Sequence, residues 1–198
     1  MRGAPGRSRR GRATLVVGVG GLPGAGKSEV AKYFSEQGAE VIDADRIGWE
    51  LLEPGTVTYE RVCKVFGSQV LDSSGRIDRR KLGEIVFRSK TARMRLNRII
   101  HPRLLAELRR RAFARVRGRW PGSAVRVIDA ALLFYWGWHR RVDLAIAVVA
   151  PRAIKLRRLM DQGLTRTQAG QRLGSQLPEA KLRAMADLVI VNNGSRGR

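Results

Sequence analysis

Cysteine is nearly absent from this chain of 198 residues, which carries only Cys63. A single cysteine excludes an intrachain disulfide and fits a reducing compartment, so we expect a cytoplasmic protein. Long apolar runs are also missing. None approaches the roughly 20 residues that span a bilayer, so we expect no transmembrane helix and no membrane partner. Aromatic residues make up only 6%, and none form a stacking array for nucleic-acid bases beside the arginines.

Acidic residues are scarce as well, 17 against 39 lysines and arginines, which gives a net charge of +22. Such an excess attracts anionic metabolites and nucleic acid, although solvated helix faces rich in arginine produce the same charge without a partner. The first twelve residues contain no acid and no apolar core. They do not form a secretory signal, and we expect residues 1–12 to be a disordered basic arm.

Apolar strands alternate with helices along the rest of the chain. The run "TLVVGVG" at 14–20 is typical of a strand buried on both faces, and a helix at 27–38 and a second strand at 39–45 follow it. Further strands are expected within 124–134, 142–151 and 187–194. This pattern predicts an α/β fold with a doubly wound parallel sheet.

A helical excursion separates the second strand from the third, between about residues 46 and 118. We therefore divide the predicted domain at 13–198 into a core, at 13–45 and 122–195, and a helical insert. The long helical pattern after residue 90 contains His101-Pro102, where proline disfavours helix in the residue before it, so we expect a break there.

The stretch "GLPGAGKS" follows the first strand and matches G-x-x-x-x-G-K-[ST] without a mismatch. Glycines let consecutive N–H groups point at a triphosphate, and the helix that follows adds its positive dipole end. Lys27 is placed to reach the β- and γ-phosphates as a catalytic cation, and the Ser28 hydroxyl to bind Mg²⁺. We therefore expect ATP and Mg²⁺ to bind at Gly21, Leu22, Pro23, Gly24, Ala25, Gly26, Lys27 and Ser28.

Three aspartates follow predicted strands, at the edge where ligands bind in open α/β sheets. Asp43 and Asp45 are two residues apart, so in an extended strand they face the same side. Asp45 is the candidate general base that takes a proton from an acceptor hydroxyl. Both residues have an alternative role as N-caps of the next helix. Asp129 binds substrate or metal in our interpretation, or it only forms a turn.

Taken together and in order, several segments resemble the dephospho-coenzyme A kinases. They are "GLPGAGKS", "VIDADRIGWELLEPG", "GRIDRRKLGEIVF", "IIHPRL", "DAALLF", "VDLAIAVVAP", "RLGSQ" and "ADLVIVNNG", which cover residues 14–195. The resemblance implies transfer of the ATP γ-phosphate to the 3′-hydroxyl of dephospho-coenzyme A, the last step of coenzyme A biosynthesis. It also implies a P-loop kinase with strand order 2-3-1-4-5, acceptor binding by the insert, and a lid at about 152–177. We expect a monomer.

The resemblance also assigns roles to individual residues. It makes Asp45 the general base, and it places Arg79 and His101 on the acceptor side. Asp43 and Asp129 are further candidates for substrate binding because they follow strands. Asn192, after the last strand, corresponds to a position near the adenine of ATP. Simpler alternatives remain: a solvated charge for Arg79, a helix break for His101 and a turn for Asn192.

The predicted lid departs from the family pattern, because Asp161 or Gln162 stands where an arginine is expected. Arg157, Arg158 or Arg166 is a possible substitute. Two other functions stay open at this point. One is a P-loop kinase for a nucleoside monophosphate or another small acceptor. The other is a nucleotide-gated protein that binds nucleic acid through its basic segments.

Overall fold

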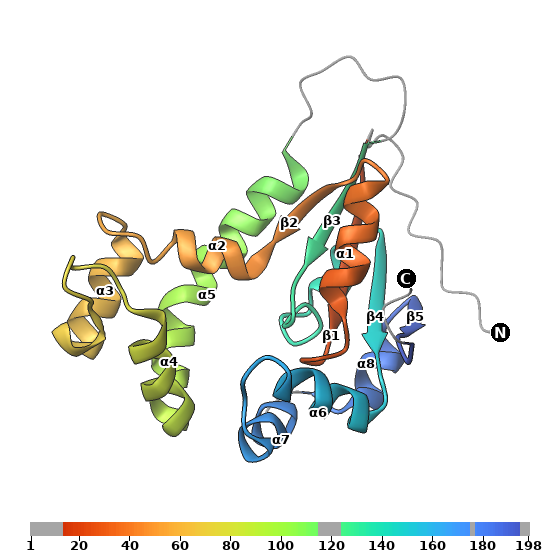
Figure 1. The fold of residues 1–198 in the computed structure, drawn as a ribbon. Coiled ribbons are helices and arrows are strands. Elements are labelled where there is room, and N and C mark those ends of the chain that lie inside the picture. Colours follow the sequence, from red (N-terminus) through yellow and green to blue (C-terminus); the bar gives the residue numbers. More distant parts are fainter. Residues whose placement is uncertain (1–13, 115–123, 175–176, 195–198) are drawn as a thin grey trace. The chain divides into compact units, whose positions relative to one another are not determined.

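The chain divides into two compact units. The computed structural model describes residues 14–114, 124–174 and 177–194. One unit comprises residues 1–42 with 115–198, and the other comprises residues 43–114. Figure 1 shows a sheet with helices in the first unit and helices in the second. The basic arm predicted at 1–12 lies outside the described residues. Within the described ranges, no helix combines the length and apolarity needed to cross a membrane.

The first unit is built on a parallel sheet of five strands within the described residues, in the order β2-β3-β1-β4-β5. β1 pairs in parallel with β3 and with β4, and β4 with β5. The strand order and the direction predicted above are therefore confirmed. The bounds are β1 Thr14–Gly21, β2 Glu40–Asp43, β3 Ala124–Asp129, β4 Leu144–Val149 and β5 Leu188–Val191.

The core of this unit lies between the central strands and helix α1 (Lys27–Glu36). Val17 of β1, Val127 of β3 and Ile146 of β4 are each at most 1% exposed. Phe34 of α1 packs against this cluster, and Figure 1 shows α1 lying along β1. The continuous apolar strands are thus buried because a neighbouring layer covers them, as expected for a parallel sheet.

Two aspartates fix the register at the start of the last two strands. The Asp143 carboxylate accepts from the Val16 N–H at 2.9 Å, and the Asp187 carboxylate accepts from the Ala145 N–H at 2.8 Å. The pairing register at the start of two strands also determines which residues lie side by side at their carboxyl ends. There Asn192 donates its backbone N–H to Val149 O at 2.8 Å.

Three further helices of the first unit follow β4. They are α6 (Arg152–Met160), α7 (Arg166–Gly174) and α8 (Glu179–Met185). The segment predicted to form a lid, at 152–177, contains α6 and α7. Its closure stays a prediction.

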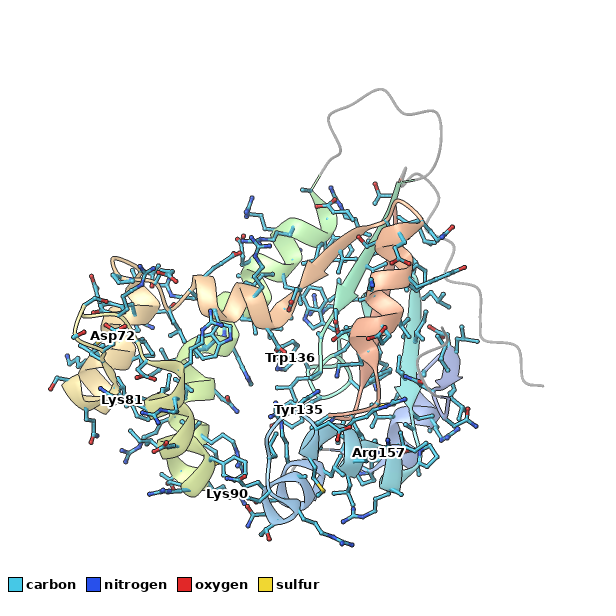
Figure 2. All side chains as sticks on the ribbon, viewed as in Figure 1. Asp72, Lys81, Lys90, Tyr135, Trp136 and Arg157 are labelled. Carbon is cyan, nitrogen blue, oxygen red and sulfur yellow. The ribbon has the colours of Figure 1, made fainter. Side chains whose placement is uncertain are left out.

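The second unit contains α2 (Ala44–Glu50), α3 (Val57–Phe66), α4 (Arg79–Arg88) and α5 (Lys90–Phe113). The side chains of Thr56, Asp78 and Ser89 accept N–H bonds at the starts of α3, α4 and α5, respectively. Lys81 of α4, labelled in Figure 2, donates to Leu71 O at 2.6 Å. A separate core holds the unit together: Leu52, Val62, Phe66, Val70 and Leu82.

The helix break expected at His101-Pro102 is wrong. α5 runs from Lys90 to Phe113 with Pro102 inside it. A proline in a helix removes one N–H bond and usually breaks or kinks the helix. Here, apolar burial continues on both sides of the proline: Leu96, Ile99 and Ile100 pack against the second core, and Leu104 and Leu108 are buried. Tertiary burial therefore outweighs the local cost.

Two valines of α3 test whether the second unit has a core of its own. Val62 is 0% exposed and Val65 is 45% exposed, although both lie on the same helix. Val62→Ala leaves a cavity, so we expect the free energy of unfolding to fall by about 2 kcal/mol. Val65→Ala is the matched control and should stay within about 0.5 kcal/mol. Urea denaturation measures both, and equal losses would contradict this assignment.

Candidate active site

The phosphate loop (residues 21–28) connects β1 to α1, where the sequence places it. Gly24 and Gly26 adopt positive φ values of 72° and 93°. An added Cβ at Gly24 would lie 2.7 Å from Lys155 O, and one at Gly26 would lie 2.0 Å from Asn192 Nδ2. Both positions therefore require glycine. Because α1 begins at Lys27, the positive end of the helix dipole lies at Lys27 and Ser28, so the loop suits a triphosphate.

Asp129 ends β3 and Asn192 follows β5, and these two strands lie on opposite sides of β1 in the sheet. Asp129 is the last residue of β3 and lies in register with Val19 of β1. The Asn192 side chain donates from Nδ2 to Ala25 O at 3.0 Å. Both residues thus belong to the carboxyl edge of the sheet, as predicted. Their contacts with a ligand stay predictions.

A pocket of about 350 Å³ lies beside Leu22 of the phosphate loop. Its most unusual feature is Lys155 of α6, which is 5% exposed and donates to Glu179 Oε2 at 2.7 Å. Burial raises the pKa of the Glu179 carboxyl, but hydrogen bonds from the Lys155 ammonium and the Arg183 guanidinium, together with their positive charges, leave that pKa below its usual value. A buried charge needs such a partner, so the pair ties α6 to α8. No motif in the sequence indicated this pair.

Asp43 and Asp45 do not share one side of a strand, so that expectation is wrong. β2 ends at Asp43, and α2 begins at Ala44. The Asp43 carboxylate accepts from the N–H groups of Asp45 at 2.8 Å and Arg46 at 3.0 Å, so it is the helix N-cap. Asp45 lies in the first turn of α2, where the helix dipole stabilises a carboxylate.

A pocket of about 460 Å³ in the second unit contains Asp43, Asp45, Arg46, Trp49, Glu50, Glu53 and Arg79. The Arg79 guanidinium stacks over the Trp49 ring at 4.2 Å from its centroid. Glu50 is paired with Arg46 at 3.2 Å and Arg111 at 2.6 Å, and Glu53 is paired with Arg76. Two of the four acidic residues of the pocket, Glu50 and Glu53, are thus paired with arginines. The pocket therefore combines Asp45 with a flat wall formed by the Trp49 ring and the Arg79 guanidinium.

The structure brings Asp45 and Arg79 to one pocket, as the sequence suggested, but it does not include His101 there. His101 lies on α5 and is half-buried, and burial lowers the pKa of its imidazole. Its contact with substrate stays a prediction. The sequence-based prediction did not include Trp49. Its position one helical turn after Asp45 was the one indication that it lies on the same face of α2.

Arg111 of α5 bonds to two carboxylates, and one of them, Glu50, belongs to this pocket. It donates to Glu50 at 2.6 Å and to Glu107 at 2.7 Å. Hydrogen bonds from Arg110 and Arg111 lower the pKa of Glu107 from 4.5 to about 2, and the bond from Arg111 also lowers the pKa of Glu50. The ionised carboxylates therefore fasten α2 to α5.

The depressed pKa of Glu107 predicts an acid-sensitive stability. A carboxyl group with a lowered pKa in the folded state stabilises the fold above its unfolded pKa, and that contribution is lost as pH falls through the folded value. The free energy of unfolding should therefore fall between pH 4.5 and about 2, and Glu107→Gln should make this fall shallower. Urea midpoints across this range measure it. Glu84→Gln, at an exposed site on α4, should keep the parent slope, and identical slopes for all three proteins would contradict the assignment.

Comparison with known proteins gives a consistent result. A model of the family described as dephospho-CoA kinase matches residues 15–197. The dephospho-CoA kinase of Geobacillus kaustophilus is 39% identical over 184 residues, which is 92% of this chain and 90% of that protein. The one of Syntrophotalea carbinolica is 40% identical over 182 residues, which is 91% of this chain and 85% of that protein.

Solved structures agree with the sequence matches. The structure of a dephospho-CoA kinase from Campylobacter jejuni aligns with a TM-score of 0.63 at 26% identity, covering 91% of this chain and 89% of that one. The resemblance inferred from the sequence is therefore confirmed. The match includes the phosphate loop, the residues of both pockets and the five-stranded P-loop kinase sheet, and this chain belongs to the dephospho-CoA kinase family.

Proposed function

We propose that this chain transfers the γ-phosphate of ATP to the 3′-hydroxyl of dephospho-coenzyme A, giving coenzyme A and ADP. One observation carries the proposal: the family match over residues 15–197 includes both the phosphate loop and the pocket that contains Asp45 and Arg79. The nucleotide loop and the acceptor pocket therefore fall within one family pattern. The cytoplasmic location and the monomeric state stay predictions.

The phosphate loop supports the nucleotide end of this reaction. Backbone N–H groups at 24–28 and the Lys27 ammonium group would bind the β- and γ-phosphates, and the Ser28 hydroxyl would hold Mg²⁺. A bound Mg²⁺ neutralises charge on the phosphate oxygens. The glycines fit this role because a side chain at Gly24 or Gly26 would meet neighbouring protein atoms.

Asp45 supports the acceptor end. In the proposed step, the acceptor oxygen forms a bond to the γ-phosphorus, and the bond from that phosphorus to the β–γ bridging oxygen breaks. The hydroxyl proton passes to the Asp45 carboxylate, and ADP leaves. The Asp43 carboxylate caps α2, whereas Asp45 lies within the first turn of that helix and belongs to the acceptor pocket, so we assign the base to Asp45.

Neither alternative function is favoured by the family match. A panel of acceptors tests them directly. Release of ADP should depend on dephospho-coenzyme A, with little turnover on AMP, CMP or UMP. Turnover confined to the nucleoside monophosphates would instead support the other kinase. Binding of random RNA that is strong, sensitive to salt and changed by ATP would support the nucleic-acid binder.

Substitutions at three positions separate phosphate binding from proton transfer. Lys27→Ala should abolish turnover. Asp45→Asn should leave MgATP binding intact and lower kcat by about 10²- to 10⁴-fold. Asp43→Asn is the matched comparison, because asparagine caps a helix as well as aspartate does, and it should keep most of the rate. Calorimetry and steady-state kinetics measure these effects. If Asp43→Asn is inactive while Asp45→Asn is active, the base is Asp43.

Two adjacent arginines test the acceptor pocket. Arg79 stacks on Trp49 within the pocket, whereas its neighbour Arg80 is exposed and does not contribute to it. Loss of a charge-assisted contact to the acceptor should raise the KM for dephospho-coenzyme A about tenfold in Arg79→Leu, with the KM for ATP unchanged. Arg80→Leu should resemble the parent enzyme. Equal KM values in the two variants would remove Arg79 from the acceptor site.

A further inference from the structure

Arg158 of α6 contacts the phosphate loop from its carbonyl side. Its guanidinium donates to Gly24 O at 3.2 Å and to Ala25 O at 3.3 Å. It also donates to Asn192 Oδ1 at 3.2 Å and to Gly194 O at 3.1 Å. Four acceptors on two segments far apart in the sequence thus meet one planar group, a geometry that the rigid fork of arginine suits and lysine does not.

Asn192 completes this arrangement from the end of β5. Its Oδ1 accepts from Arg158, and its Nδ2 donates to Ala25 O at 3.0 Å, so both ends of the amide contact protein. Its backbone is anchored to Val149 of the neighbouring strand. The Arg158 and Asn192 side chains are called the carbonyl brace below. The brace connects the loop to the sheet and to α6.

The carbonyl brace acts on the peptide bond between Ala25 and Gly26. Within the described chain no peptide is cis, and in a trans peptide the N–H points opposite to the C=O. Because the brace holds Ala25 O from two sides, it directs the Gly26 N–H to the opposite side of the loop. Glycine backbones are otherwise free to rotate. Ordering the loop when phosphate binds would then reduce the free energy of binding.

We propose that Arg158 and Asn192 are positioning residues that order the phosphate loop before the nucleotide binds. This inference rests on the proposed function, since it assumes that the loop binds a triphosphate. Arg158 then supports the loop and does not replace the missing lid arginine, a role that stays open to Arg157, which is exposed on α6 (Figure 2). Asn192 likewise supports the loop and does not recognise the adenine of the nucleotide.

The first test uses the protein without nucleotide. Hydrogen exchange of a peptide covering residues 21–28 should be at least about fivefold faster in Arg158→Leu and in Asn192→Ala than in the parent. The control is Arg183→Leu, which removes one exposed arginine of α8 that bonds to Glu179. It should exchange like the parent. Unchanged exchange in both brace variants would overturn the proposal, because a side chain that only contacts nucleotide leaves the empty loop unaltered.

The second test compares MgATP with magnesium tripolyphosphate, which has no base or ribose. Asn192→Ala should weaken both ligands by the same factor, about tenfold, in calorimetric titrations. If Asn192→Ala weakens the binding of MgATP alone, the proposal for Asn192 is overturned, and its side chain contacts the adenine or ribose of ATP instead. Arg158→Lys keeps the charge, yet it should bind both ligands about as weakly as Arg158→Leu. Full recovery by lysine would overturn the proposal for Arg158, since charge alone would then suffice.

Folding and function are separated in the same experiments. Thermal melting of each variant identifies a loss of fold, and Arg158→Lys and Asn192→Ala are mild enough to replace Arg158→Leu if it fails to fold. Both tests need no acceptor. A protein that binds triphosphate through a braced loop but does not phosphorylate dephospho-coenzyme A would refute the proposed function and leave the carbonyl brace standing.

Discussion

The phosphate loop faces one constraint that shapes the first unit: its N–H groups must point at an anion while its carbonyl oxygens bond elsewhere. Glycine makes the backbone conformation possible, since Gly24 and Gly26 have positive φ and no room for a side chain. Glycine does not hold that conformation in place. The Ala25 carbonyl is held by Arg158 and Asn192, which come from α6 and from the end of β5. Sheet register thereby contributes to the geometry of the loop.

The second unit positions the Asp45 carboxylate and the Arg79 guanidinium of its pocket on helices, without a sheet. Its helices have their own core and side-chain caps. Arg111 bonds to Glu50 and Glu107 and so fastens α2 to α5 behind the pocket. The cap formed by Asp43 begins α2, and the next turn carries Asp45 and then Trp49. The proposed base and the cap that begins the helix thus belong to the same short segment.

The sequence predicted the sheet and the phosphate loop well, because both depend on local patterns: apolar runs, glycine spacing and the step from strand to helix. It failed where two local rules compete. Asp45 was expected in the same strand as Asp43, but the strand ends at Asp43, which takes the alternative role of N-cap, and Asp45 lies in the helix that follows. Pro102 was expected to break a helix that burial maintains. The contact of Arg158 with Gly24 joins residues 134 positions apart, which no local pattern reveals.

The central claim is that a phosphoryl group bound at this loop is transferred to a ribose hydroxyl. The most direct measurement uses ATP with ¹⁸O in its γ-phosphoryl group, dephospho-coenzyme A and the purified protein, with mass spectrometry and phosphorus NMR of the products. The account predicts that the label appears in a new phosphomonoester at the 3′-carbon of coenzyme A. Label found only in inorganic phosphate, with dephospho-coenzyme A unchanged, would contradict it.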